Sequence, residues 1–232
     1  MPDYEREKKL AAEKAIQFIE SGMTVGLGSG STSSYFIDLL GRRVRRGLQI
    51  QAIPTSNRSG RLAEEVGIPL TSFEFVNSLD ITVDGTDEFD RSLALIKGGG
   101  GALLREKIVA SASKRVIIIA DSGKRVDVLG RFPLPVEVTP FGWQVTAHKI
   151  EGLGAVPALR RGPTGEIFET AERNYILDCR FDSIRQPKEL ARKLDSIVGI
   201  VEHGLFTDLV DMVIMGHGDS VEILEPNPKA TP

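Results

Sequence analysis

The stretch of this chain best suited to chemistry spans residues 97–107 and reads Lys-Gly-Gly-Gly-Gly-Ala-Leu-Leu-Arg-Glu-Lys. The glycine loop at residues 98–101 can adopt positive φ angles, and no side chain covers its backbone N–H groups. A helix predicted over residues 102–113 follows at once, and its unpaired N–H groups can bind an anion or an oxyanion. Lys97 and Glu106 add a cation and a carboxylate, so the stretch can contact one small charged ligand.

Such a stretch also has a plainer interpretation. A glycine-rich loop before a helix often serves only as a tight strand-to-helix connection. In that case Glu106 is a solvated surface charge that pairs with Arg105 or Lys107.

A second candidate segment, at residues 26–32, reads Gly-Leu-Gly-Ser-Gly-Ser-Thr. Ser31 stands where a dinucleotide-binding fingerprint needs its third glycine, and the Gly-Lys-Ser/Thr of a nucleotide P-loop is missing. The hydroxyl groups of Ser29, Ser31 and Thr32 at a predicted helix N-terminus are suited to a phosphate group. The alternative is a simple N-cap with a tight turn.

Four carboxylates lie within seven residues, at Asp84, Asp87, Glu88 and Asp90. Phe89 occupies the sixth position, where the EF-hand calcium loop needs glycine, and the three histidines of the chain show no close ligand spacing. We therefore predict no metal site here. General acid–base chemistry or binding of sugar hydroxyls suits the cluster better, and a solvated acidic loop remains the alternative.

The predicted elements place these polar segments together. Strands are predicted at residues 24–27, 48–53, 78–83 and 115–120, and helices at 4–20, 56–66 and 102–113, with one more ending at residue 40. Their alternation predicts a Rossmann-like, mostly parallel sheet with helices on its faces. Ser29, Asp84 and the Asp-Ser-Gly-Lys segment at 121–124 each follow a strand directly, so they lie at the carboxyl edge where such sheets bind ligands.

The pattern changes near Gly130, which predicts a second, smaller α+β domain at residues 131–206. Its elements are helices at 144–151 and 187–194 and strands at 155–159, 167–169 and 175–178. Two further strands, at 212–215 and 221–224, complete the α/β domain of residues 1–130 and 207–232, and the first returns to the large sheet. The tail at 226–232 is expected to fray.

Composition limits the class of protein. A formal charge of −3 gives no basic field for nucleic acid or acidic membranes, and the basic cluster at residues 42–46 is predicted to lie in a solvated connection. Cys179 is the only cysteine, so an internal disulfide is ruled out and a reducing compartment fits. No apolar run approaches ~18 residues. We expect a cytoplasmic protein that acts on a small molecule.

Taken in order, the motifs at residues 28–32, 84–88, 97–107 and 121–124 resemble those of type A ribose-5-phosphate isomerase. The resemblance covers nearly the whole chain, including the plan of an α/β domain with a small α+β domain. It implies interconversion of ribose 5-phosphate and ribulose 5-phosphate in the non-oxidative pentose phosphate pathway. It also implies that no metal or other cofactor is needed and that the chain forms a homodimer or homotetramer.

The resemblance further implies roles for individual residues. Glu106 matches the base that moves a proton between C2 and C1 of the open-chain sugar through an enediol. Asp84 and Asp87 match an acidic pair that handles hydroxyl protons and ring opening, and Lys97 matches a lysine that binds substrate and steadies the enediolate. The matching substrate-binding positions are Ser29, Gly30, Ser31, Thr32, Asp84, Gly85, Thr86, Asp87, Lys97, Gly98, Gly99, Gly100 and Lys124.

Two rival functions stay open at this point. A CoA or acyl transferase would use Glu106 as a nucleophile in place of a base. A sugar-phosphate sensor would keep the phosphate-binding turn without needing Glu106 or the acidic pair. Residues 132–206 offer no chemistry of their own, and we expect them to form a subunit contact or a lid.

Overall fold

The computed structural model describes residues 2–226 and folds as two compact units. Unit 1 consists of the chain up to Thr86, Arg105–Arg125 and the chain from Asp208 onward, and unit 2 consists of Asp87–Leu104 and Val126–Thr207. The segment Asp87–Leu104, which the sequence analysis assigns to the first domain, groups with unit 2 because its strands pair there. The predicted fraying tail lies, from residue 227 onward, outside the described residues.

A six-stranded sheet forms the centre of unit 1, in the order β13-β12-β6-β3-β1-β2. The strands are β1 (Thr24–Leu27), β2 (Gln51–Pro54), β3 (Ile81–Asp84), β6 (Val116–Asp121), β12 (Met212–His217) and β13 (Ser220–Leu224). All neighbours run parallel except β12 and β13, so the predicted mostly parallel sheet is confirmed. As predicted, β12 returns to this sheet, where Met212 lies beside Ile117 of β6.

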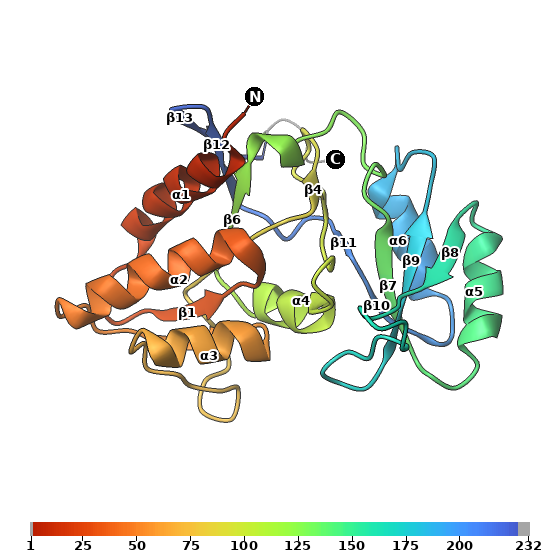
Figure 1. Ribbon diagram of the computed structural model, residues 1–232, viewed down its shortest axis with the longest axis horizontal. Coiled ribbons are helices and arrows are strands. Elements are labelled where there is room, and N and C mark those ends of the chain that lie inside the picture. The colour runs from red at the N-terminus through yellow and green to blue at the C-terminus, as the bar shows by residue number, and fades with distance from the viewer. Residues whose placement is uncertain (1, 227–232) are drawn as a thin grey trace. The chain divides into compact units, whose positions relative to one another are not determined.

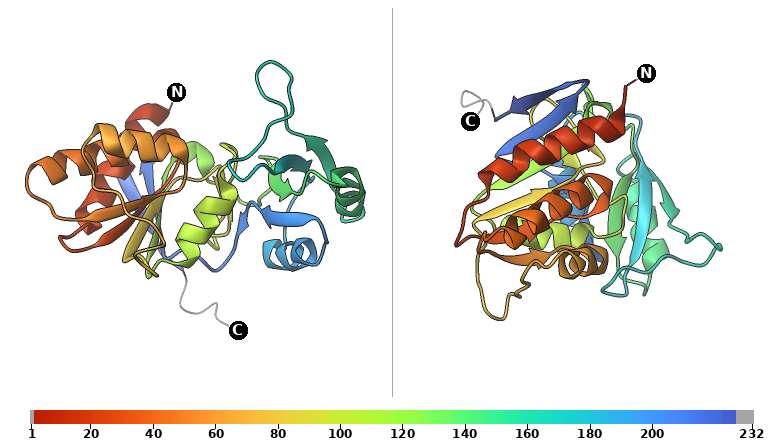
Figure 2. Two further views of the ribbon diagram at one scale, coloured as in Figure 1. Left: turned by 90° about the horizontal axis from the view of Figure 1, so that it is seen from below. Right: turned by 60° about the vertical axis from the view of Figure 1, so that its left-hand side comes forward.

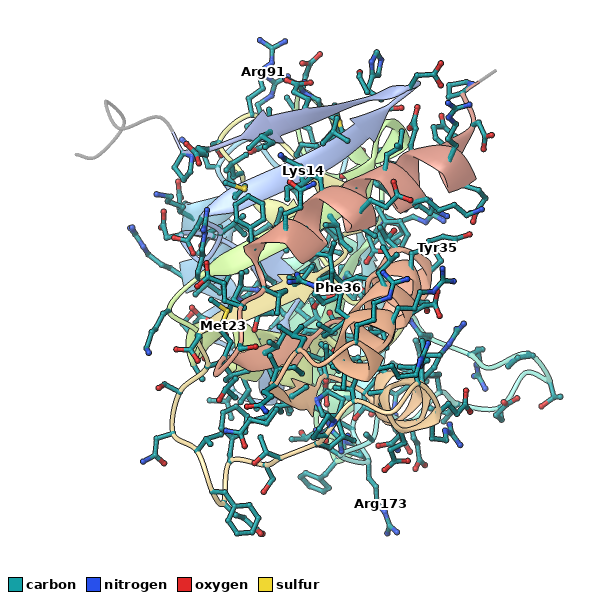
Figure 3. The ribbon with its side chains drawn as sticks, turned by 90° about the vertical axis from the view of Figure 1, so that its left-hand side faces the viewer. Lys14, Met23, Tyr35, Phe36, Arg91 and Arg173 are labelled. Carbon is teal, nitrogen blue, oxygen red and sulfur yellow. The ribbon has the colours of Figure 1, made fainter. Side chains whose placement is uncertain are left out.

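Helices cover both faces of this sheet. They are α1 (Tyr4–Ala15), followed by a 3₁₀ turn at Ile16–Phe18, and α2 (Gly30–Arg45), α3 (Asn57–Glu65) and α4 (Leu103–Ser111). The helices α1 and α2 lie side by side over one face, as Figure 1 and the right-hand view of Figure 2 show. Phe36 of α2, labelled in Figure 3, is fully buried in the apolar core that also contains Val25 and Leu27 of β1. On the other face, Val109 of α4 packs over Gly26.

The basic cluster at residues 42–46 lies largely inside a helix, so its prediction as a connection is wrong. Arg42, Arg43 and Arg45 form the last turn of α2. Cations are favoured there because the helix dipole is negative at its C-terminus. Arg43 also donates through Nη1 to the backbone oxygens of Ile16 (2.6 Å) and Ile19 (3.0 Å), which joins α2 to the end of the preceding helical segment.

Unit 2 contains a four-stranded antiparallel sheet in the order β10-β7-β9-β8 and a three-stranded sheet in the order β11-β5-β4. The strands are β4 (Glu88–Phe89), β5 (Leu95–Ile96), β7 (Leu134–Val138), β8 (Val156–Leu159), β9 (Tyr175–Arg180), β10 (Ile200–His203) and β11 (Leu205–Phe206). The strand predicted at 167–169 is absent from the described residues as a strand, because Ile167 and Glu169 form only isolated bridges.

The helices α5 (Trp143–Glu151) and α6 (Pro187–Asp195) pack on one face of the four-stranded sheet (Figure 1). Their Ile150 and Leu194 join alternate residues of β7 and β9 in one apolar core. This core includes Cys179, and burial raises the pKa of its thiol to about 12. The thiol therefore stays protonated at neutral pH. Within residues 2–226, no helix is long and apolar enough to cross a membrane.

Candidate active site

The hydroxyl-rich turn at residues 29–32 begins helix α2 immediately after strand β1. Gly30 has a φ of +92°, which glycine adopts without strain and which turns the chain into the helix. The side chain of Ser29 makes no capping hydrogen bond and instead shares one with Thr55 Oγ1 at 2.8 Å. Gly30 and Ser31 are exposed, so the N-terminal N–H groups of a 16-residue helix open to solvent at this turn. Such an end can bind a phosphate group.

Asp84, at the end of strand β3, connects to this turn by a hydrogen bond. Its side chain is 2% exposed, and Oδ1 accepts hydrogen bonds from the backbone N–H of Ser29 (3.0 Å) and Gly85 (2.7 Å). The hydroxyl of Ser33 lies 3.4 Å from the same oxygen. The structure thus joins two segments that the sequence predicts at one sheet edge, and Asp84 is held rigidly between them.

Gly28 leaves no room for a side chain beside Asp84. A Cβ at this position would lie 2.0 Å from Asp84 Oδ1 and 2.4 Å from its backbone Cα. Since the backbone of a central strand cannot withdraw, we expect Gly28→Ala to lower the free energy of unfolding by about 1–3 kcal/mol. Thermal and urea unfolding measure this change.

Gly60→Ala in α3 is a matched control, because a Cβ there meets only Pro54, at 3.4 Å. Alanine favours a helix over glycine, so Gly60→Ala should leave stability equal or raise it. Equal melting of the Gly28→Ala and Gly60→Ala proteins would contradict the close packing against Asp84.

Glu106 lies in the first turn of α4 and is only 6% exposed. A carboxylate this deeply buried is not a solvated surface charge, so the plainer interpretation of this residue loses its support. Its neighbour Arg105 donates through Nη1 to Asn57 Oδ1 at 3.1 Å. In the sequence, the buried Glu106 carboxylate thus comes five residues after the last glycine of the loop.

Lys124 ends a 3₁₀ turn, Ser122–Lys124, at the carboxyl end of β6. Glu7 of α1 holds this turn: its Oε2 accepts from the N–H of Ser122 (2.8 Å) and from the Ser122 hydroxyl (2.7 Å). Its Oε1 accepts from the N–H of Gly218 at 2.9 Å. Glu7 is 1% exposed, so a buried carboxylate from the first helix positions the turn that carries Lys124.

The Glu7 contacts predict a pH dependence of stability. Burial alone would raise the pKa of this carboxyl, but hydrogen bonds from Gly218 and Ser122 outweigh it and lower the pKa below 4.5. A carboxyl whose pKa is lower in the folded state stabilises the fold above its unfolded pKa and loses this effect as pH falls through the folded value.

We therefore expect Glu7→Gln to lower the free energy of unfolding at pH 7 by about 1–3 kcal/mol. The difference in the free energy of unfolding between parent and variant should become progressively smaller below pH 4.5. Urea unfolding at several pH values measures both effects. The control is Glu13→Gln, at an exposed position of the same helix, which should melt like the parent at every pH. A gap that stays constant down to pH 2 would contradict the assignment.

In unit 2, the glycine loop is held by Asp87. Asp87 Oδ2 accepts the N–H of Gly99 at 2.7 Å, and the N–H of Asp87 in turn donates to Ile96 O at 2.9 Å. Gly98 and Gly101 have φ angles of +101° and +78°, so both positions require glycine's freedom. The loop is thus a fixed structure with Gly99 and Gly100 exposed.

Lys97 is 3% exposed at the start of the glycine loop. Its N–H donates to Gly204 O at 2.8 Å, and its Nζ lies 5.5 Å from the centroid of the Phe206 ring. The ring face stabilises the ammonium group. The Lys97 ammonium group, the Asp87 carboxylate and the N–H groups of the glycine loop therefore all belong to the segment Asp87–Leu104 of unit 2.

The family model described as Ribose 5-phosphate isomerase A (phosphoriboisomerase A) matches residues 51–220. The chain belongs to this family.

This chain matches named relatives over nearly the whole length of each relative. "Ribose-5-phosphate isomerase A" of Cereibacter sphaeroides is 50% identical over 220 residues, which is 91% of this chain and 88% of the relative. "Ribose-5-phosphate isomerase A 1" of Oceanobacillus iheyensis is 50% identical over 96% of this chain and all of its own length. A solved structure of a D-ribose-5-phosphate isomerase in complex with phospho-erythronic acid aligns with a TM-score of 0.93 and 40% identity, over 96% of this chain and 99% of that one. None of these relatives is named as a transferase or a sensor.

In this member of the isomerase family, all four carboxylates of the acidic cluster accept hydrogen bonds from backbone N–H groups. Glu88 is fully buried, and its oxygens accept from the N–H of Phe132 (2.6 Å) and Gly130 (2.9 Å). Asp90 Oδ1 accepts from the N–H of Ser92 and Ala94. These two carboxylates therefore stabilise turns of unit 2.

One group of potential metal ligands occurs among the described residues, at Asp195, Glu202 and His203. His203 Nδ1 accepts the N–H of Leu205 at 3.2 Å, so Nε2 carries the proton and donates to Asp195 Oδ1 at 3.1 Å. Both ring nitrogens are thus occupied by protein groups, and the cluster includes none of the predicted site residues.

Sequence reasoning missed two residues that support the site. Glu7 is one, and Arg160, which contacts the glycine loop, is the other. Neither belongs to a motif. Their partners lie 115 and 62 residues away in the chain, so no local pattern could have identified them.

Proposed function

We propose that this chain catalyses the interconversion of D-ribose 5-phosphate and D-ribulose 5-phosphate, an aldose–ketose isomerisation. The observation that carries the proposal is the buried carboxylate of Glu106, 6% exposed, directly after a glycine loop whose N–H groups can meet an oxyanion. The isomerisation needs one base that accepts a proton beside a carbonyl and returns it to the neighbouring carbon. A positioned base of this kind contributes typically ~10²–10⁴-fold.

Glu106 serves as this base. Its carboxylate removes the proton from C2 of the open-chain aldose, the C2–H electron pair forms a C1=C2 bond, and O1 gains negative charge and then a proton. The enediol loses the O2 proton, C2=O forms, and Glu106 returns its proton to C1. Atoms and electrons balance with no outside oxidant or reductant.

The oxygens of the substrate need their own partners during this transfer. Asp84 and Asp87 exchange the hydroxyl protons and assist ring opening. Lys97 and the N–H groups of the glycine loop stabilise the enediolate oxygen where its charge develops. The phosphate binds at the Ser29–Thr32 turn, with Lys124 as its cation, and Gly85 and Thr86 line the sugar.

Proton exchange in D₂O tests the proposal. Purified protein is incubated with ribose 5-phosphate and a chelator, and the reaction is followed by NMR. We expect ribulose 5-phosphate with deuterium at C1, formed without added metal. Binding without conversion or exchange would favour a sugar-phosphate sensor, and loss of binding as well would direct the next test to acyl or CoA transfer.

We also propose that the enzyme is a homodimer or homotetramer. The exposed apolar side chains of Phe141 (96%), Val145 (63%) and Val156 (69%) in unit 2 support a protein contact there. Light scattering after size exclusion measures the mass in solution. A mass of one 25.3 kDa chain at micromolar concentration would contradict the proposal.

The cytoplasm is the compartment we propose for this reaction. The single thiol, which can form no internal disulfide, agrees with it. Recovery of the activity mainly in a secreted or membrane fraction of the source cells would contradict it.

A further inference from the structure

We propose that Arg160 is a positioning residue for catalysis: it holds the carbonyl groups of the glycine loop so that the loop's N–H groups face the developing oxyanion. This inference rests on the proposed isomerase function. Arg160 directly follows strand β8, and its Nη1 donates to Gly98 O at 2.9 Å and to Gly99 O at 3.2 Å. One guanidinium group thus contacts two successive peptide carbonyls of the loop.

The guanidinium is itself fixed by neighbours in unit 2. Its Nε donates to Asp178 Oδ2 at 2.9 Å, and its Nη2 donates to Asp178 Oδ1, which makes a two-pronged ion pair. The Arg160 side chain is 12% exposed, and its Cζ lies 5.7 Å from the centroid of the Phe168 ring. A bidentate ion pair of this kind fixes the orientation of the planar guanidinium group, and a lysine ammonium group cannot form it.

The Arg160 backbone is anchored as well. Its N–H donates to Ile176 O of β9 at 2.8 Å, and its carbonyl accepts the N–H of Phe168 at 3.0 Å. Phe168 in turn lies against Gly101, where an added Cβ would come within 2.4 Å of the ring. The side chain and the backbone of Arg160 together therefore connect the glycine loop to strands β8 and β9.

The direction of the loop N–H groups follows from planar trans peptide geometry, because C=O and N–H point to opposite sides of each peptide unit. The carbonyl of Gly98 points to Arg160, and the N–H of the same peptide unit, on Gly99, donates to Asp87. The carbonyl of Gly99 also points to Arg160, so the N–H of Gly100 points away from it.

Gly100 is exposed, and a Cβ built on it would meet open space. Its N–H is therefore accessible to a ligand oxygen. A cation at the carbonyl end of a peptide unit also polarises its N–H, which strengthens the hydrogen bond that it donates. Arg160 thereby orients and strengthens a donor that acts mainly when the substrate oxygen becomes negative.

Kinetics of Arg160→Met test this role, because methionine keeps an apolar side chain and removes all donors. We expect kcat for ribose 5-phosphate isomerisation to fall roughly 10- to 100-fold, less than the ~10²–10³-fold cost of losing a whole oxyanion donor. KM should change less than about threefold, because the lost interaction acts in the transition state. Arg160→Lys should behave like Arg160→Met, and Asp178→Asn should show a smaller loss in the same direction.

Arg161→Met is the matched control. Arg161 also donates through Nη1 to a glycine carbonyl, Gly165 O at 3.1 Å, but Gly165 lies outside the glycine loop of residues 98–101. We expect it to leave kcat and KM within twofold of the parent. Equal kinetics of Arg160→Met and Arg161→Met, or a rise in KM without a fall in kcat, would overturn the inference.

A second readout separates this inference from the proposed function. In ¹⁵N-labelled protein without substrate, Arg160→Met should shift the amide resonances of Gly99 and Gly100, and Arg161→Met should not. Unshifted Gly99 and Gly100 resonances would overturn the positioning role even in an active enzyme. A parent protein with no isomerase activity would instead overturn the proposed function, whatever the amide result.

Discussion

Replacing Glu106 by glutamine is expected to lower kcat for the isomerisation of ribose 5-phosphate by about 10²–10⁴-fold. Glutamine has nearly the shape of glutamate but cannot accept the C2 proton, so the first step of the reaction loses its base. KM should stay within a few-fold, because the proposed role of the Glu106 charge is to accept the C2 proton in the transition state. A coupled assay for ribulose 5-phosphate measures kcat and KM. The incorporation of deuterium at C1 in D₂O measures the proton transfer itself.

Two controls make the Glu106 result specific. Glu65→Gln changes an exposed glutamate of α3 in the same unit and should leave kcat unchanged. Thermal unfolding of Glu106→Gln should match the parent, which excludes a folding defect. A kcat within tenfold of the parent would remove Glu106 from the mechanism, and a covalent adduct on Glu106 during turnover would identify it as a nucleophile.

The strands of the large sheet could be predicted from sequence because burial on both faces leaves a clear pattern. Residues 116–121 are buried throughout, and the run at residues 116–119 is entirely β-branched. Strand β1 has the predicted bounds, Thr24–Leu27. The end of α2 could not be predicted in this way, because a run of arginines is typical of a solvated loop and equally suits the C-terminal turn of a helix.

The sequence predicts the candidate residues that directly follow a predicted strand. It cannot separate the roles of neighbouring residues of the same chemical type. Its position directly after the strand predicted at residues 78–83 identified Asp84, which is the last residue of β3. The hydrogen bond with Ser29 confirms that it lies near the polar turn at residues 29–32. The four carboxylates of residues 84–90 look alike in sequence. In the structure, Glu88 and Asp90 accept backbone N–H groups within unit 2. Asp84 accepts the N–H of Ser29, and Asp87 accepts the N–H of Gly99. Their roles depend on partners that the folded chain supplies.

Asp84→Asn is expected to separate the chemistry of this carboxylate from its structural role. The asparagine oxygen can take the place of Oδ1 and keep the N–H groups of Ser29 and Gly85 paired, so stability should change by less than about 1 kcal/mol. The negative charge is lost, however. A hydrogen bond to a charged group is worth ~1.5–3 kcal/mol, so kcat should fall roughly 10- to 100-fold.

Asp90→Asn is a closely matched control for this change. Asp90 Oδ1 also accepts two backbone N–H groups and one serine hydroxyl, from Ser92 and Ala94, yet it belongs to no predicted part of the site. If the charge of Asp84 serves the reaction, Asp90→Asn should keep full activity while Asp84→Asn loses it at equal stability. Parallel behaviour of the two variants would assign Asp84 a structural role only. Asp84→Ala, which removes the acceptor of the Ser29 and Gly85 N–H groups, should lower both stability and activity.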